Sequence, residues 1–248
     1  MARTKPTWVF VVGAYRTGST TQFLLTEQVV QRTKQGMSIG YHNEKRLVEH
    51  DQHRDVPYVV CKVFIYLPET SVHGACFLHE NRIKVIGTVR DPRDIMVSMR
   101  ERSKALGNHE WSFEHVVTEE LPKWLKQFNQ WTDLGKELVH VAHFEDMITN
   151  LPREVQAIAK HLDVPIGAAQ AGRIGRSLTA GAQKARKKRF MALKSRNESS
   201  KEHPVLPSIP ALKFATAGHW VDWLSADEAH LIEQYAGEYM ERWGYAFS

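Results

Sequence analysis

At positions 13–20 the chain reads Gly13-Ala14-Tyr15-Arg16-Thr17-Gly18-Ser19-Thr20, the outline of a phosphate-binding loop without its lysine. The nucleoside-triphosphate pattern G-x-x-x-x-G-K-[ST] cradles phosphates on backbone N–H groups and sends its lysine to the β- and γ-phosphates. Here Ser19 takes the place of that lysine, and the nearest cation is Arg16. Backbone amides at a helix N-terminus still hold an anion. The loop therefore predicts a ligand with fewer phosphates than a nucleoside triphosphate, and no metal.

The residues on both sides of this loop predict a strand and a helix. The loop follows a short apolar and β-branched run, Trp8-Val9-Phe10-Val11-Val12, which is typical of a buried parallel strand. From Thr20 to Thr33, apolar residues recur near helical spacing, and Thr20 or Thr21 can cap the helix start. Strand, glycine loop and helix in this order are the context that a phosphate-binding loop requires.

A second segment, residues 83–98, also reads as strand, turn and helix. An apolar strand ends in Arg90, and the following Asp91-Pro92-Arg93-Asp94 suits the first turn of a helix. The Ser98 hydroxyl can point back from this helix toward the end of the strand. The alternative is an Arg90–Asp94 ion pair that only organises the turn.

Together the two segments resemble the nucleotide-binding elements of sulfotransferases that use 3′-phosphoadenosine 5′-phosphosulfate (PAPS). In that family a loop [KR]-[ST]-G-[ST]-[ST] holds the 5′-phosphosulfate, and residues 16–20 match it. A segment R-[ND]-P-[KR]-D-x-x-x-S holds the 3′-phosphate, and residues 90–98 match it. Phe144-Glu145-Asp146-Met147 is similar to the family's Y-E-D-L element, and Gly218-His219-Trp220 to its glycine-x-tryptophan segment. The resemblance covers most of residues 7–100, 138–165 and 212–245.

This resemblance implies a single α/β domain over residues 1–248, with a central parallel β-sheet flanked by helices as in P-loop nucleoside triphosphatases. It implies sulfuryl transfer from PAPS to a hydroxyl or amine of a small-molecule acceptor, with release of adenosine 3′,5′-bisphosphate (PAP). Thr21 stands where many members carry a tryptophan, and Lys213 is all that remains of a basic pair. The expected nucleotide contacts are Arg16, Thr17, Gly18, Ser19, Thr20, Thr21, Arg90, Ser98 and Lys213.

The chemistry requires a cation where negative charge grows on the departing oxygen, because such a cation stabilises the transition state more than the ground state. We expect Arg16 in this role, and Lys62, within an apolar strand, as a second cation. The alternative for Lys62 is a strand-end lysine that buries its stem and keeps its charge in water.

The general base is the point at which the chain departs from the family pattern. Many members have a histidine two residues after the lysine that matches Lys62, but this chain has Phe64 there. Others use a glutamate between the loop's helix and the next strand, and Glu44 lies in that interval. We expect Glu44 to be the base, with His42 second and His73 third, because burial can tune either residue type.

Composition sets further limits. A hydrophobic content of 42% and a charged content of 25% are typical of a soluble globular protein. No apolar run approaches the roughly 20 residues that span a bilayer, and residues 1–6 have no signal-peptide core. Cys61 and Cys76 lack metal or redox spacing, and the 13 histidines lack a zinc pattern. We expect a cytoplasmic protein without a membrane segment, disulfides or a catalytic metal.

Much of the net charge of +5 comes from a basic run over residues 184–196. We interpret residues 183–211 as a flexible basic loop or lid that adds positive field to the nucleotide. Two other function classes stay open: a P-loop kinase-like phosphotransferase that uses Arg16 in place of lysine, and a non-catalytic nucleic-acid-binding protein that uses the basic run. A nucleic-acid partner is not expected, and the sequence does not encode the oligomeric state.

Overall fold

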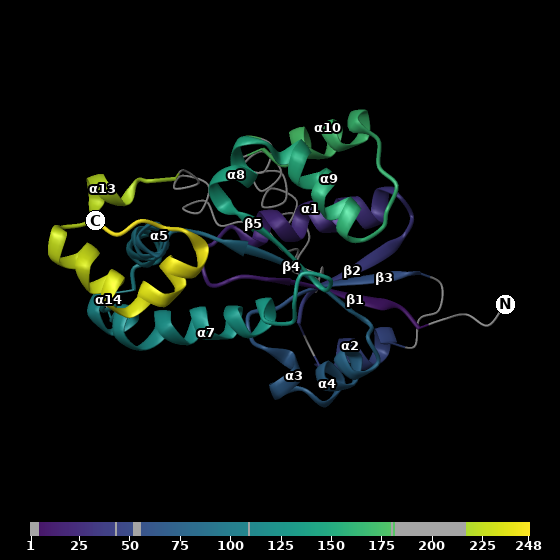
Figure 1. Cartoon of the computed structure of the whole chain (residues 1–248), viewed down its shortest axis with the longest axis horizontal. Coiled ribbons are helices and arrows are strands. Elements are labelled where there is room, and N and C mark those ends of the chain that lie inside the picture. Colours follow the sequence, from purple (N-terminus) through teal and green to yellow (C-terminus); the bar gives the residue numbers. More distant parts are fainter. Residues whose placement is uncertain (1–4, 43, 52–55, 109, 180, 182–216) are drawn as a thin grey trace.

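A parallel five-stranded sheet forms the centre of the protein, in the strand order β2-β3-β1-β4-β5 (Figure 1). The computed structural model describes all residues except 1–4, 43, 52–55, 109, 180 and 182–216. The strands are β1 (Thr7–Val12), β2 (Gly36–Tyr41), β3 (Tyr58–Lys62), β4 (Ile83–Val89) and β5 (Val139–His143). The predicted α/β class with a central parallel sheet is confirmed.

Helices cover both faces of this sheet (Figure 1). One face carries α1 (Ser19–Arg32), α8 (Phe144–Thr149), α9 (Leu151–His161) and α10 (Ala168–Ser177). The other carries α2 (Glu44–Asp51), α3 (Leu67–Thr70), α4 (Val72–His79) and α7 (Leu121–Thr132).

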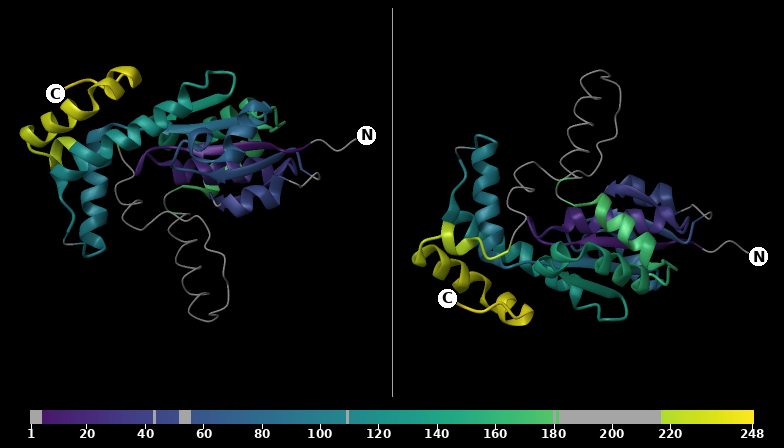
Figure 2. Two further views of the ribbon diagram at one scale, coloured as in Figure 1. Left: turned by 90° about the horizontal axis from the view of Figure 1, so that it is seen from below. Right: turned by 90° about the horizontal axis from the view of Figure 1, so that it is seen from above.

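The remaining helices gather beyond the carboxyl ends of the strands, where α13 and α14 lie at the end of the molecule toward which β1 runs (Figure 2). They are α5 (Pro92–Ala105), α6 (Phe113–His115), the π-helix η1 (Val116–Glu120), α13 (Trp220–Trp223) and α14 (Ala226–Trp243). The last helix begins at a Ser225–Glu228 capping box and ends at Gly244 with φ 74°, as its sequence predicts.

Strand β1 shows why a continuous apolar run becomes the central strand. Successive side chains of a strand point to opposite faces. Trp8, Phe10 and Val12 therefore pack with the helices of one face, whereas Val9 and Val11 pack with α1 and α9 on the other. All five side chains are at most 1% exposed, so both layers of the core meet on this strand.

The sheet order also locates a ligand site. The chain leaves β1, returns through β2 and β3 on one side, and then crosses to β4 on the other side. Ligands of open α/β sheets bind at the carboxyl ends of the strands where the order reverses. The loop after β1 lies at this point, between the ends of β3 and β4.

The start of α1 differs from the prediction. Neither Thr20 nor Thr21 caps the helix, because α1 begins at Ser19 and its N-cap is Gly18, with φ 91° and no side-chain cap. A Cβ at position 18 would lie 2.5 Å from the Phe144 ring, so both the backbone angle and the space require glycine. The Thr20 hydroxyl is instead used by Lys62.

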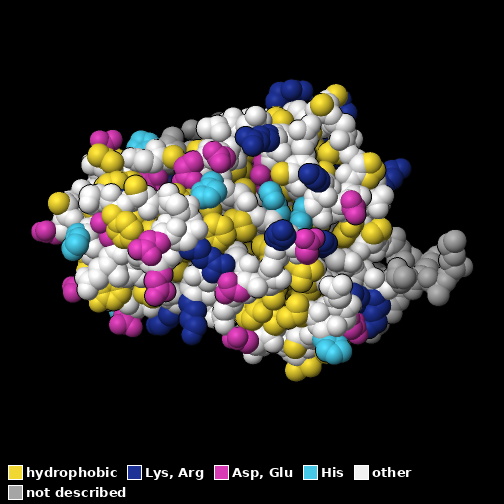
Figure 3. All heavy atoms as spheres, viewed as in Figure 1, with side chains coloured by type: hydrophobic (Ala, Val, Ile, Leu, Met, Phe, Trp, Pro, Cys, Tyr) yellow, Lys and Arg dark blue, Asp and Glu magenta, His cyan; other side chains and the backbone are white. Residues whose placement is uncertain are grey.

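The surface carries charges of both signs. On the face in Figure 3, Lys and Arg side chains are interspersed with Asp and Glu. None of the helices in the described part of the chain combines the length and apolar composition needed to cross a bilayer.

Candidate nucleotide site and active centre

The two segments expected to share a ligand are in direct contact. Arg16 Nε donates to Ser98 Oγ at 3.0 Å, and Arg90 Nη1 donates to the Arg16 carbonyl oxygen at 3.0 Å. Arg90 and Ser98 are 3% and 1% exposed. The carboxyl end of β4 and the start of α5 therefore face the loop after β1.

The loop presents backbone N–H groups in the geometry of an anion site. Arg16 and Gly18 both have positive φ, 69° and 91°, and the Thr17 hydroxyl donates to the Ala14 carbonyl at 2.9 Å and fixes the turn. Because α1 starts at Ser19, the first N–H groups of the helix carry the positive end of its dipole, and the N–H of Thr21 donates to the carbonyl of the N-cap residue Gly18 at 2.8 Å. This arrangement suits a phosphate or phosphosulfate group. Thr21 lies in the same first turn.

Lys62 brings a second cation to this loop. Its side chain is 2% exposed, and Nζ donates to Thr20 Oγ1 at 2.6 Å. The alternative of a lysine whose charge lies in water is therefore wrong. Burial, and secondly the charge of Arg16, lower the pKa of Lys62 from 10.5 to about 7.

The pKa of Arg16 is lowered for the same reason as that of Lys62. Burial lowers its pKa from 12.5 to about 10, with smaller contributions from Arg102 and Arg90. Neighbouring cations that repel one another are stabilised by a bound anion. The arrangement of Arg16, Lys62 and Arg90 therefore suits a ligand with several negative charges.

The three candidate bases form one cluster beside Lys62. Glu44 accepts from His73 Nδ1 at 2.7 Å and from Ser71 Oγ at 2.9 Å, and His42 Nε2 lies 3.4 Å from it. Burial alone would raise the pKa of Glu44, but these hydrogen bonds outweigh burial and lower it. The backbone N–H of His42 donates to the Lys62 carbonyl at 2.8 Å, which joins the cluster to the end of β3. The sequence did not signal the part played by Ser71, because it lies 27 positions after Glu44, between α3 and α4.

Aromatic side chains line the other side of Lys62. Its Nζ lies 5.3 Å from the Tyr41 ring centroid and 5.2 Å from that of Phe64. Tyr15 stacks on Phe64 at 4.7 Å, and Trp124 of α7 meets Tyr15 edge-on at 4.8 Å. Sequence reasoning missed this cluster, because Trp124 follows the helical spacing of core residues and the four rings come from four separate segments.

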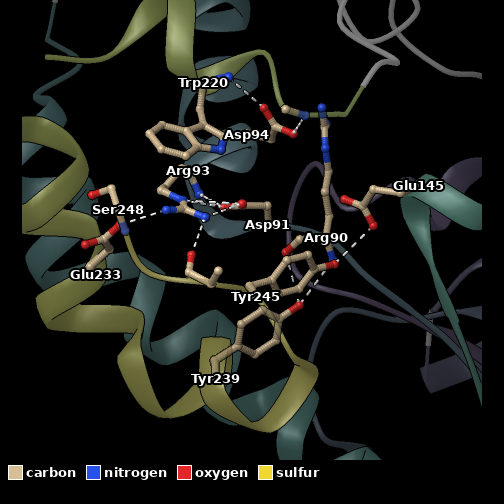
Figure 4. Close-up of polar contacts among 12 residues, drawn as sticks. Arg90, Asp91, Arg93, Asp94, Glu145, Trp220, Glu233, Tyr239, Tyr245 and Ser248 are labelled. Carbon is tan, nitrogen blue, oxygen red and sulfur yellow. Dashed lines mark hydrogen bonds and ion pairs between the residues drawn. The ribbon is translucent and has the colours of Figure 1, made fainter. Parts of the chain in front are cut away.

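Arg90 has a second set of neighbours. Its guanidinium lies 4.3 Å above the Phe144 ring, and Figure 4 shows its side chain running between Asp94 and Glu145. The carboxylate of Asp94 accepts from the backbone N–H groups of Gly218 at 2.7 Å and Trp220 at 3.0 Å. Asp94 therefore does more than organise its own turn.

Some expectations fall outside the described residues. These are Lys213 and the basic loop over residues 183–211, including the run 184–196. Within the part of the chain that the structure describes, no group of three or more His, Cys, Asp or Glu side chains is placed to hold a metal ion.

Comparison with known proteins supplies the family. A sulfotransferase domain model matches residues 6–244, whereas no curated protein matches. The fold is similar to that of a mouse sulfotransferase, SULT7A1, solved with PAP, with a TM-score of 0.66 and 17% identity over 95% of this chain and 85% of that one. It is also similar to retinol dehydratase solved with androsterone and inactive cofactor PAP, with a TM-score of 0.63 and 17% identity over 96% of this chain and 82% of that one.

The solved structures establish the likeness of the fold, and the domain model establishes descent. Because that model extends from the start of β1 to the end of α14, the resemblance noted at two loops holds for the whole domain. The protein belongs to the sulfotransferase domain family.

Proposed function

We propose that this protein transfers a sulfuryl group from PAPS to a hydroxyl or amine of a small-molecule acceptor and releases PAP. The observation that carries the proposal is the contact of Arg16 with Ser98 and of Arg90 with the Arg16 carbonyl. The two segments to which we assign the 5′ and 3′ anionic groups are in contact, which supports a ligand with phosphate on both its 5′ and 3′ sides.

In this proposal the 5′-phosphosulfate lies on the loop amides from Thr17 to Thr20. The 3′-phosphate lies at Arg90 and Ser98, with Lys213 as a further contact. The acceptor oxygen or nitrogen attacks sulfur in line, a new bond to sulfur forms, and the bond from sulfur to the 5′-phosphate oxygen breaks. Arg16 and Lys62 stabilise the charge that grows on this departing oxygen.

The acceptor loses a proton in the same step, and we assign the uptake of this proton to the Glu44 cluster. Glu44 is the proposed base, and His42 and His73 are the next candidates. In this cluster Glu44 accepts a hydrogen bond from His73 Nδ1 at 2.7 Å. If His73 acts as the base, its other ring nitrogen, Nε2, would accept the proton. A carboxylate that orients an imidazole in this way is a common arrangement for proton transfer.

The rings beside Lys62 favour an acceptor with an apolar body. Tyr41 is 43% exposed, and it lies with Phe64 next to the Lys62 ammonium. An apolar ligand that covers these rings removes their area from water while its hydroxyl or amine reaches the sulfuryl group. Two similar solved structures hold retinol or androsterone, small molecules of this kind.

The competing functions have less support. The sulfotransferase domain model that matches residues 6–244 favours neither a kinase-like phosphotransferase that uses Arg16 in place of lysine nor a non-catalytic nucleic-acid-binding protein. A cytoplasmic location belongs to this proposal as well; it is supported by the two cysteines, which are unpaired.

The test supplies the donor PAPS and measures the product PAP. Purified protein is mixed with PAPS and a panel of ring-bearing alcohols and amines, and formation of PAP is followed. We expect PAP formation that depends on the acceptor and persists in a metal chelator. Binding of ATP with Mg²⁺ in preference to PAP would instead support the kinase-like reading.

A further inference from the structure

Arg90, the proposed contact of the 3′-phosphate, is a buried cation with a carboxylate on either side. Asp94 and Glu145 both favour its charged form, whereas burial opposes that form and dominates, so that the pKa of Arg90 is lowered. Figure 4 shows the long Arg90 side chain extended between these two carboxylates. The two carboxylates therefore attract the guanidinium from either side, in addition to the Arg16 carbonyl and the Phe144 ring that it contacts.

Each of the two carboxylates is held by a group from the C-terminal segment, Gly218–Ser248. The two oxygens of Asp94 accept from the N–H groups of Gly218 and Trp220. Glu145 Oε2 accepts from the Tyr245 hydroxyl at 3.2 Å. The same segment reaches the Arg90 backbone, since the Tyr239 hydroxyl lies 3.3 Å from its nitrogen and 3.4 Å from its oxygen.

The neighbouring Arg93 keeps this segment in place without touching Arg90. Its guanidinium lies 3.9 Å from the Trp220 ring centroid. It also donates to Glu233 at 2.7 Å and to the Ala246 carbonyl at 2.8 Å. The sequence motif of residues 90–94 therefore divides in two: Arg90 faces the proposed phosphate site, and Arg93 and Asp94 fasten the C-terminal segment beside it.

We infer that the C-terminal segment positions Arg90 for the 3′-phosphate by fixing the two carboxylates that flank it, with Asp94 and Tyr245 as positioning residues. The inference rests on the proposed function, which assigns the 3′-phosphate to Arg90. It extends that function by making recognition of the 3′-phosphate depend on residues that do not touch the nucleotide.

The experiment compares two ligands that differ only in the 3′-phosphate. Dissociation constants for PAP and for adenosine 5′-monophosphate are measured by calorimetry on the intact protein, on Tyr245→Phe and on Asp94→Glu. Asp94→Glu keeps the charge but shifts the carboxylate away from the two N–H groups, and Tyr245→Phe deletes a single hydroxyl. We expect both variants to raise the dissociation constant of PAP by about 3- to 10-fold, the effect of one or two hydrogen bonds to a charged group. The dissociation constant of the monophosphate should stay within about twofold of the wild-type value.

Two control variants separate positioning from stability. Tyr235→Phe removes the hydroxyl of a tyrosine of α14, in the same C-terminal segment, that is 41% exposed. Asp51→Asn weakens the ion pair with Arg82, which does not involve the C-terminal segment, and should lower the melting temperature. Both controls should keep the wild-type ratio of PAP to monophosphate affinity.

The outcomes distinguish the inference from the function beneath it. If Tyr245→Phe and Asp94→Glu lower the affinity for both ligands equally, or change neither affinity, the C-terminal segment has no specific effect on Arg90 and the inference is wrong. If the wild-type protein does not prefer PAP over the monophosphate, the proposed function itself is wrong.

Discussion

Arg16 departs from the nucleoside-triphosphate pattern, and its Nε donates a hydrogen bond to the Ser98 hydroxyl. The lysine of a triphosphate loop sits one residue after the second glycine, whereas Arg16 sits two residues before it. Its planar guanidinium can make two parallel hydrogen bonds to a phosphate. This geometry suits charge that develops on one bridging oxygen.

Replacement of Arg16 by alanine tests this role. We expect Arg16→Ala to lower kcat by about 10²- to 10³-fold, the usual effect of losing a group that stabilises developing charge. The dissociation constant of PAP should change much less, and Arg16→Lys should recover part of the rate. Steady-state kinetics and PAP titration measure the two effects. Equal losses in both would place Arg16 in ground-state binding instead.

Lys62 predicts a pH dependence of binding. With its pKa lowered to about 7, the folded protein binds fewer protons than the unfolded chain between pH 7 and 10, so this group's contribution to the free energy of unfolding rises with pH in that window. The phosphates of PAP favour the ammonium and raise the pKa again. Binding should therefore take up a proton, and PAP affinity should fall as pH rises above 7.

Calorimetry at about pH 8 in two buffers of different ionisation enthalpy measures this proton uptake. In Lys62→Met the uptake should disappear, while the fold remains because the substituted side chain fits the same buried, ring-lined position. An unchanged uptake in this variant would assign the proton to another group.

At the scale of elements, the start of α1 depends on one glycine. Gly18→Ala adds a Cβ at 2.5 Å from the Phe144 ring at a residue with φ 91°. Strain and overpacking together should lower the free energy of unfolding by about 2–4 kcal/mol and weaken the binding of PAP. Gly107→Ala is the matched control, because φ is 64° there but nothing lies within 4 Å. It should cost about 1 kcal/mol and leave PAP binding intact; chemical denaturation measures both.

The elements also show what the sequence could predict. The strand before Gly13, the helix start at Pro92 and the capping box at Ser225 are local patterns, and the structure confirms them. The cap of α1 could not be read in the same way, because its geometry depends on Phe144 packing against Gly18. The aromatic cluster at Lys62 was hidden for a similar reason, since only the folded sheet brings Tyr15, Tyr41 and Phe64 together.

At the scale of the molecule, the nucleotide should stabilise the fold, because it contacts the loop after β1 and the β4–α5 segment at the same time. At a PAP concentration 100 times the dissociation constant, binding stabilises the folded state by about 2.7 kcal/mol. For a domain of this size that should raise the melting temperature by roughly 5–10 °C. Thermal denaturation with and without PAP measures the shift. ATP with Mg²⁺ should produce a smaller one, and the reverse order would contradict the proposed function.

The fold class and the family were within reach of the sequence because both depend on short motifs at the ends of strands β1 and β4. The roles of individual site residues remain predictions, although the structure brings Arg16, Lys62, Arg90 and Ser98 to one edge of the sheet. The support of Arg90 by Tyr239 and Tyr245 was not predictable, because 149 positions separate Tyr239 from Arg90.

That separation has a consequence for how the protein folds. Contacts between residues so far apart in the chain close late, because a long loop must first lose its conformational entropy. During refolding, helical circular dichroism should return before the capacity to bind PAP. The recovery of PAP binding would then mark the step in which the C-terminal segment packs beside Arg90. A folding intermediate with a complete sheet but an undocked C-terminal segment would not yet bind the nucleotide.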